Sequence, residues 1–157
     1  MPAVGYAEFL AQKRLVVQSP IQDVDTSSIH PMLFPFQRDL VRWAVRKGRA
    51  AISGDTGTGK TLMQVEWSRL MGKRTLIVAP LSVARQTVRE AQKIGVDVRY
   101  VRSQAEVTRD HRIWITNYDM LAHFDAAAFG AVVLDESSIL KSLDGKTRTL
   151  LIGMFAN

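Results

Sequence analysis

Short apolar runs alternate with longer amphipathic stretches over most of this chain, and each run has the length of a buried strand. Runs rich in Val, Ile, Leu and Ala are typical of strands that are covered on both faces, as in parallel sheets. They predict strands at residues 49–53, 75–80, 96–101, 112–116 and 131–134.

The stretches between these runs show apolar positions three and four residues apart, which is helical spacing. They predict helices at residues 35–47, 62–70, 82–94, 118–124 and 147–155. Strands that alternate with helices in this way favour a parallel sheet with right-handed crossovers and helices on both faces. The expected fold class is therefore α/β.

Residues 1–33 form an N-terminal extension with little recognisable chemistry. A short helix is expected at residues 6–15, whereas residues 19–31, with two prolines and several Ser, Thr and Asp residues, have the composition of a loop. The first strongly marked element is the helix at 35–47, which has Pro35 at its start and Gly48 just past its end. Its apolar face is expected to consist of Phe36, Leu40, Trp43 and Ala44, and a row of arginines, interpreted as solvated, consists of Arg38, Arg42 and Arg46.

Composition narrows the class of protein. The chain has 157 residues, of which 46% are hydrophobic and 23% charged, so it can bury a core. It contains no cysteine, which excludes disulfides and thiolate metal sites, and its three histidines show no metal spacing. No apolar run has the length of a membrane span and the N-terminus has no signal-peptide core, so a cytoplasmic protein without a membrane partner is expected. The net charge of +6 favours a polyanionic partner, nucleic acid first.

One stretch carries a specific chemical signal, because it fits the phosphate-binding pattern G-x-x-x-x-G-K-[ST] at every fixed position. Its glycines allow the backbone N–H groups to surround an anion, and the helix that follows directs its positive end at the same place. Lys60 is expected to contact the β- and γ-phosphates, and the Thr61 hydroxyl to ligate Mg²⁺. The predicted nucleotide-binding residues are Gly54, Asp55, Thr56, Gly57, Thr58, Gly59, Lys60 and Thr61.

Two acids follow directly after the apolar run at 131–134. Ligands of open α/β sheets bind outside the carboxyl ends of the strands, where the phosphate loop also lies. Asp135 is therefore expected in the Mg²⁺ shell opposite Thr61, and Glu136 is expected to act as the general base on the attacking water. Acids at this position also open helices as capping residues, but the phosphate loop about 75 residues upstream favours the catalytic role.

A row of cations is expected along the helix at 82–94, where Arg85, Arg89 and Lys93 recur every four residues. Like charges at this spacing repel one another mildly, and bound anions relieve the repulsion. Phosphates of a nucleic-acid strand and bulk counterions are both candidates for these anions.

Taken together, these motifs resemble the first motor domain of superfamily-two helicases and translocases, closest to Swi/Snf-like members of phage and bacteria. The resemblance covers residues 34–150. Residues 34–38 are similar to the Q motif, and residues 54–61 are similar to motif I. Residues 78–82, with Arg85 and Gln86, resemble motif Ia, and residues 115–118 resemble motif Ib. Residues 135–138 resemble the DExx box, and residues 140–142 resemble the Leu-Lys-Asn that follows it. Ser138 departs from the His or Asp usual at the fourth DExx position.

The resemblance implies a RecA-like P-loop NTPase domain that uses ATP and Mg²⁺ and binds nucleic acid, DNA rather than RNA, in the cytoplasm of a bacterium or a phage-infected host. It implies that Gln37 reads the adenine edge, that Lys60 and Glu136 are catalytic, and that motif Ia contacts the nucleic-acid backbone without reading sequence. The nucleic-acid contacts that follow from it are Pro80, Ser82, Arg85, Arg89, Thr116 and Asn117. Two other functions stay open: a P-loop ATPase without motor activity, and a nucleotide-binding module without turnover.

The resemblance also implies that residues 34–157 are an incomplete motor domain. Motif III, the last strands of the sheet and the second motor domain with its arginine finger have no counterpart in the sequence. The missing strand is expected between those at 49–53 and 131–134, which leaves a gap lined by Ala50, Ile52, Val132 and Leu134. A chain with such a gap is expected to be marginally stable or to aggregate, and neither to translocate nor to unwind DNA.

Overall fold

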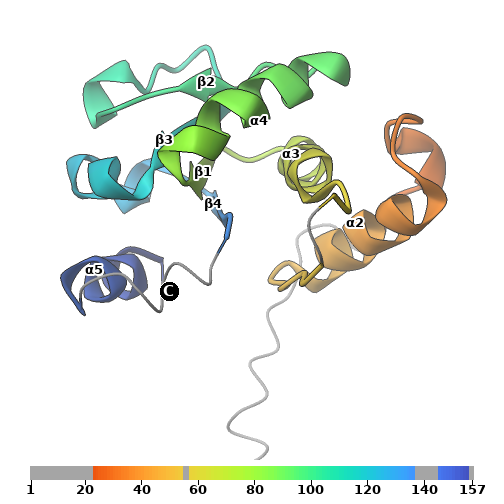
Figure 1. The fold of residues 1–157 in the computed structure, drawn as a ribbon, viewed down its shortest axis with the longest axis horizontal. Helices are drawn as coiled ribbons and strands as arrows, with labels where there is room; N and C mark the ends of the chain where they lie inside the picture. The colour runs from red at the N-terminus through yellow and green to blue at the C-terminus, as the bar shows by residue number, and fades with distance from the viewer. Residues whose placement is uncertain (1–22, 55–56, 137–144, 156–157) are drawn as a thin grey trace, which may run out of the picture.

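A parallel sheet of four strands forms the centre of the described chain (Figure 1). The computed structural model describes residues 23–54, 57–136 and 145–155. The strand order is β2-β3-β1-β4, and every pairing in it is parallel. The strands are β1 (Thr75–Ala79), β2 (Arg99–Tyr100), β3 (Ile113–Asn117) and β4 (Ala131–Leu134). The expected α/β class with a parallel sheet is confirmed.

In the described residues, four α-helices and four short 3₁₀ helices connect or flank these strands. The α-helices are α2 (Pro35–Lys47), α3 (Lys60–Met71), α4 (Leu81–Lys93) and α5 (Gly145–Phe155). The 3₁₀ helices are η1 (Thr26–Ser28), η2 (Gln104–Glu106), η3 (Tyr118–His123) and η4 (Ala126–Ala128). The short helix expected at 118–124 is present as the 3₁₀ helix η3, whereas the helix expected at 6–15 lies outside the described residues.

Alternate residues of the central strands enter two separate cores, one on each face of the sheet. Ile77 and Ile115 point into the core that α2, α3 and α4 cover. Leu76 and Trp114 point into the opposite core, which η3 and α5 cover. Figure 1 shows α4 and α5 on opposite sides of the strands. The helices cover both faces of the sheet, as the sequence predicts.

Helix α2 buries a different face from the one expected. Its buried residues are Gln37, Val41, Ala44 and Val45, whereas Phe36 and Trp43 are exposed. The reason lies at the helix start, where the Gln37 side chain accepts a hydrogen bond from the Phe34 N–H at 2.8 Å. Gln37 is thereby turned inward, and the residues one and two turns later follow it into the core.

The segment at 49–53 is not a strand, which corrects the prediction. Ala50, Ala51 and Ser53 are exposed, and no described strand pairs with this segment. A strand needs a hydrogen-bonded neighbour, and here the nearest candidate, β4, pairs only with β1 among the described residues. Of the two strands expected to border a gap in the sheet, the described residues contain only β4, and the gap itself stays a prediction.

Candidate functional site

The phosphate loop leads directly into α3. Gly57 and Gly59 have φ angles of 87° and 74°, in the left-handed region that only glycine adopts readily, and Gly59 is the N-cap of α3. A side chain at Gly59 would also collide with the Gln37 amide. Two of the predicted nucleotide-binding residues, Asp55 and Thr56, lie outside the described residues.

Lys60, the first residue of α3, folds back over the loop. Its Nζ donates a hydrogen bond to the Gly54 carbonyl at 2.6 Å. A lysine ammonium can exchange one oxygen acceptor for another, so the group that holds the loop together is also the group that could bind a phosphate oxygen. The positive end of α3 faces the same loop, because Gly57 to Gly59 run into its first turn.

Gln37 supports the phosphate loop from the α2 side. Its Nε2 donates to the Thr58 carbonyl at 2.8 Å, while its Oε1 accepts from Phe34 N–H. The side chain is only 4% exposed. Both ends of its amide are used within the chain, so the adenine contact that the resemblance implies stays a prediction.

The acidic end of the site begins where β4 ends. Asp135 continues the ladder beyond β4, because its N–H donates to the Val78 carbonyl at 2.8 Å. Its Oδ1 accepts a hydrogen bond of 2.9 Å from Nε2 of Gln64, a residue of α3. Gln64 follows Thr61 by three positions and shares its face of the helix. This bond therefore brings the Asp135 carboxylate beside the helix face that carries Thr61.

Glu136 stands in a strained conformation directly after Asp135. Its φ of 53° is the one positive φ of a non-glycine residue in the described parts of the chain. Its side chain is exposed, so the carboxylate can reach solvent. Tyr118, the first residue of η3, donates from its hydroxyl to the Asp135 carbonyl at 2.6 Å. Gln64 does not stand out in the sequence, and Tyr118 does so only as part of the motif Ib resemblance; neither contact with Asp135 is predictable, because the partners lie 71 and 17 residues apart.

Burial raises the pKa of the Tyr118 phenol to about 12, and the nearby charges of Asp135 and Glu136 act in the same direction. The hydroxyl therefore stays protonated at neutral pH and remains a hydrogen-bond donor.

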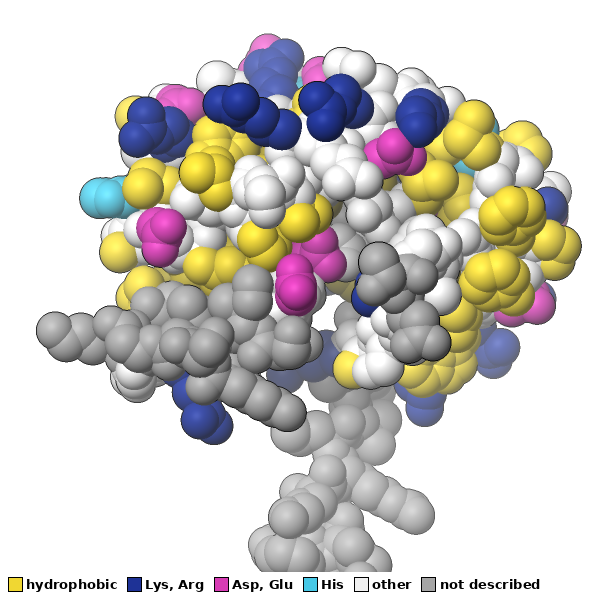
Figure 2. Space-filling model, viewed as in Figure 1, with side chains coloured by type: hydrophobic (Ala, Val, Ile, Leu, Met, Phe, Trp, Pro, Cys, Tyr) yellow, Lys and Arg dark blue, Asp and Glu magenta, His cyan; other side chains and the backbone are white. Residues whose placement is uncertain are grey.

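The predicted nucleic-acid contacts divide into two groups. Ser82, Arg85 and Arg89 are exposed on α4, next to the partly buried Pro80 that caps the helix. Figure 2 shows Lys and Arg side chains gathered along this side of the molecule. Thr116 and Asn117 lie at the end of β3 with their side chains buried, so those side chains do not reach the surface in this conformation.

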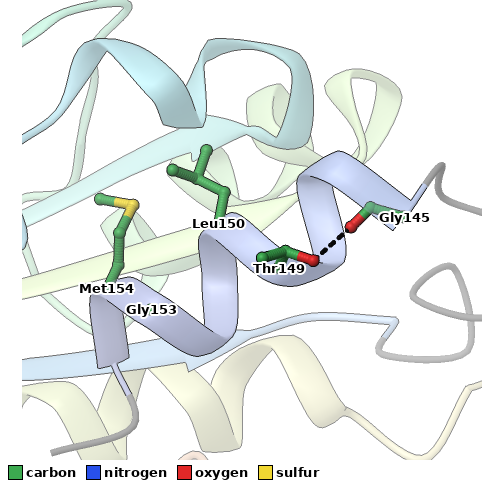
Figure 3. A pocket seen from close by; sticks show the side chains of 5 residues that line it. All are labelled: Gly145, Thr149, Leu150, Gly153 and Met154. Carbon is green, nitrogen blue, oxygen red and sulfur yellow. Dashed lines mark hydrogen bonds between the residues drawn. The ribbon is translucent and has the colours of Figure 1, made fainter.

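A separate pocket of about 590 Å³ lies on α5 (Figure 3). The described residues that line it are Gly145, Thr149, Leu150, Gly153 and Met154. Its one hydroxyl, that of Thr149, already donates to the Gly145 carbonyl at 2.7 Å. These residues offer no charged group to a ligand, and none of the described residues of the phosphate loop is among them.

Metal sites of three or more His, Asp or Glu side chains do not occur among the described residues. Nor does the described part of the chain contain a helix that is both long and apolar enough to cross a bilayer.

Comparison of the sequence with protein-family profiles and with curated proteins found no match. Comparison of the fold with solved structures found several. The SWI2/SNF2 ATPase core of Sulfolobus solfataricus, solved in complex with dsDNA, matches with a TM-score of 0.67 and 22% identity over 83% of this chain and 31% of that one. The UvsW helicase of bacteriophage T4 matches with a TM-score of 0.63 and 13% identity over 98% of this chain and 57% of that one. The chain thus has the α/β fold found in helicase motor proteins, and it spans about a third and just over half of these two.

Proposed function

We propose that this chain is the ATP-binding motor domain of an ATP-dependent DNA helicase or translocase. The observation that carries the proposal is the 2.9 Å hydrogen bond between Gln64 and Asp135. It joins the helix that begins at the phosphate loop to the acid that follows β4, which are the two halves that a P-loop nucleotide site requires. The similarity of the fold to helicase motor proteins supports the same function.

The loop that ends at Gly59 would hold the phosphates, and Lys60 would exchange its bond with the Gly54 carbonyl for a phosphate oxygen. The exposed Glu136 carboxylate would accept a proton from the attacking water as general base. In this role the chain supplies positioning and electrostatic stabilisation rather than a covalent intermediate.

The residues present fit a magnesium ion. Mg²⁺ prefers hard oxygen ligands, and the Thr61 hydroxyl and the Asp135 carboxylate are oxygen donors that the Gln64 bond brings to one side of α3. One carboxylate oxygen of Asp135 accepts from Gln64, so the side chain is oriented before any ion arrives. Thr61 and Asp135 would hold the ion, which when bound would supply positive charge against the charge that develops on the phosphate oxygens.

The nucleic-acid partner would lie along α4. Arg85 and Arg89 are exposed there, and ion pairs with either are absent from the described residues. Guanidinium groups in a row contact backbone phosphates without reading base sequence. The solved complex of the Sulfolobus ATPase core with dsDNA favours DNA as the partner. A cytoplasmic location in a bacterium or an infected host is part of the same proposal.

Hydrolysis coupled to movement would belong to a longer protein. We propose that further strands complete the sheet at the free edge of β4 and that a second motor domain supplies an arginine finger. Such a finger contributes about 10³ to 10⁵ in rate. By this proposal residues 1–157 alone bind nucleotide but turn it over slowly.

Calorimetric titration with ATP and Mg²⁺ tests the proposal. Lys60→Ala should abolish or greatly weaken binding, because it removes the cation of the loop without disturbing the core. Lys47→Ala, which removes an exposed lysine at the end of α2, is the matched control and should bind like wild type. Equal ATP affinity for wild type and Lys60→Ala would contradict the assignment.

Glu136→Gln separates a motor ATPase from a nucleotide-binding module. In the full-length protein this variant should bind ATP normally and stop hydrolysis. A wild-type protein that binds ATP but shows no single-turnover hydrolysis would instead be a binding module, and hydrolysis that DNA does not stimulate would indicate a P-loop ATPase without motor activity.

A further inference from the structure

Asp135, the residue before Glu136, forms hydrogen bonds with three different elements. The Asp135 N–H donates to Val78 of β1, its carboxylate accepts from Gln64 of α3, and its carbonyl accepts from the Tyr118 hydroxyl. Only the last of these bonds reaches the peptide group that links Asp135 to Glu136. The Tyr118 hydroxyl is therefore the contact that sets the plane of that peptide.

The orientation of this peptide affects the conformation of Glu136. A left-handed φ of 53° at a residue with a Cβ is unfavourable, and it persists only where surrounding contacts hold it. The φ angle of Glu136 describes rotation about its N–Cα bond, and that nitrogen belongs to the peptide held by Tyr118. The direction of the Glu136 side chain therefore depends on the hydrogen bond from the Tyr118 hydroxyl. Residues held in such sparsely populated conformations cluster at active sites and switch regions.

Tyr118 also lies directly after the end of β3, where the resemblance predicts nucleic-acid contacts at residues whose side chains are buried in this structure. It follows Thr116 and Asn117 of β3 directly and is itself buried. In the sheet, β1 separates β3 from β4, so the tyrosine spans the end of β1 to reach Asp135. A shift of the β3 end would move the hydroxyl, and the hydroxyl would move the peptide before Glu136.

We infer that Tyr118 is a positioning residue that sets the direction of the Glu136 carboxylate and transmits the state of the β3 end to it. The inference rests on the proposed function, and it adds a regulatory contact to that site. It needs no movement of the phosphate loop, so it affects turnover and its stimulation by DNA but leaves nucleotide affinity alone.

The ring of Tyr118 has a second, purely structural role that the test must separate from the first. It packs in the same core as Leu121, Phe124 and Leu151. Tyr118→Phe keeps the ring in that core and removes only the oxygen atom. Tyr100→Phe is the matched control, because the Tyr100 hydroxyl bonds to the Asn117 side chain at 3.4 Å and not to the acidic turn.

The experiment compares steady-state ATP hydrolysis of the full-length wild type, Tyr118→Phe and Tyr100→Phe, with and without double-stranded DNA, beside their ATP affinities from calorimetry. Tyr118→Phe should lower kcat about 10- to 100-fold, the range expected when a catalytic group is displaced by about 1 Å. The ATP Kd should stay unchanged and the stimulation by DNA should fall towards one, whereas Tyr100→Phe should keep the basal kcat and the ATP Kd of wild type.

Replacement of Tyr118 by 4-aminophenylalanine keeps a donor at the same position and should restore turnover. If Tyr118→Phe has a lower Tm than wild type, the 4-aminophenylalanine variant tests the inference in its place. A Tyr118→Phe protein with wild-type kcat and stimulation overturns the inference, as does an equal loss in kcat and ATP affinity, or a 4-aminophenylalanine variant as slow as Tyr118→Phe. A wild type that does not hydrolyse ATP is a separate outcome, because it overturns the proposed function itself.

Discussion

The cations of α2 and α3 differ from those of α4 in what they contact. Arg38 donates to the Leu33 carbonyl at 2.9 Å, Arg42 pairs with Asp23 at 2.9 Å, and Arg69 bonds to Glu66 and to the Ser28 carbonyl. These cations hold residues 23–33 against the helices. On α4, by contrast, Arg85 and Arg89 form no ion pair with any described residue, while Lys93 pairs with Glu90 of its own helix.

The comparison shows that spacing alone does not reveal what a row of arginines does. Arg38 and Arg42 of α2 have the same four-residue spacing as Arg85 and Arg89 of α4, yet the first two contact groups of the chain and the other two face solvent. The difference is the presence of acids and carbonyl groups within reach, which depends on the chain packed beside each helix. A cation that already has a partner inside the chain must lose it before it can bind a phosphate, and one without a partner loses only water.

The largest effect is expected at Glu66, whose carboxylate is fully buried. It accepts from the Arg69 guanidinium at 2.6 and 2.9 Å and from the His30 N–H at 2.8 Å. Glu66→Ala leaves these donors without their acceptor and should lower the free energy of unfolding by about 2–3 kcal/mol. Urea unfolding followed by circular dichroism measures this.

Glu90→Ala is the matched control, because Glu90 and Lys93 have the same i, i+3 spacing on a more exposed helix face. Its loss should stay below about 0.5 kcal/mol. Equal losses for the two variants would mean that the Glu66–Arg69 pair of α3 stabilises the fold no more than the Glu90–Lys93 pair of α4 does.

A smaller effect, on affinity rather than stability, is expected from Arg85→Ala combined with Arg89→Ala. DNA binding should weaken by a similar factor for all sequences, and the slope of log affinity against log salt should flatten by roughly 1.4 to 1.8 for two lost phosphate contacts. Fluorescence anisotropy at several salt concentrations measures both. Arg46→Ala with Lys47→Ala removes the same charge from α2 and should leave the slope unchanged, so matching slopes for the two double variants would show that only net charge matters.

The smallest effect is a pH dependence at Asp23. The hydrogen bond from Arg42 lowers the pKa of this exposed carboxyl below its ordinary value. Since the pKa is lower in the folded state, the pair stabilises the fold above the unfolded-state value near pH 4, and this contribution disappears as the pH falls through the folded-state pKa. The Tm of wild type should exceed that of Asp23→Asn slightly at pH 7 and converge with it towards pH 3. A difference that grows with acid would contradict the assignment.

Elements whose ends carry a local signal were predictable from the sequence. Pro35 and Gly48 define α2 to the residue, and the apolar run at 131–134 coincides with β4. The expected strand at 96–101 is reduced to Arg99–Tyr100, because only these residues pair with β3 while Val96 and Val98 are buried by core packing instead. Apolar residues indicate burial, but a strand also requires a hydrogen-bonded neighbouring strand. Which strand that is cannot be read from the nearby sequence.

The candidate site shows the same division. The phosphate loop, Asp135 and Glu136 are recognisable because their spacing is fixed by the anion and metal they would bind. The contacts that Gln64, Tyr118 and Gln37 make are not, because each depends on which segments of the chain lie side by side. The structure adds the residues that hold the recognisable ones in place.

The two hydrogen bonds of Gln37 have a consequence for nucleotide selectivity. Because the Thr58 carbonyl and the Phe34 N–H each hold one end of its amide and the side chain is only 4% exposed, turning the amide outward to a purine edge replaces bonds inside the protein instead of only adding new ones. An exchange of this kind changes the free energy by only a fraction of a full hydrogen bond. Discrimination between ATP and GTP through Gln37 should therefore be weak, and release of the glutamine would loosen the same loop that has to hold the phosphates.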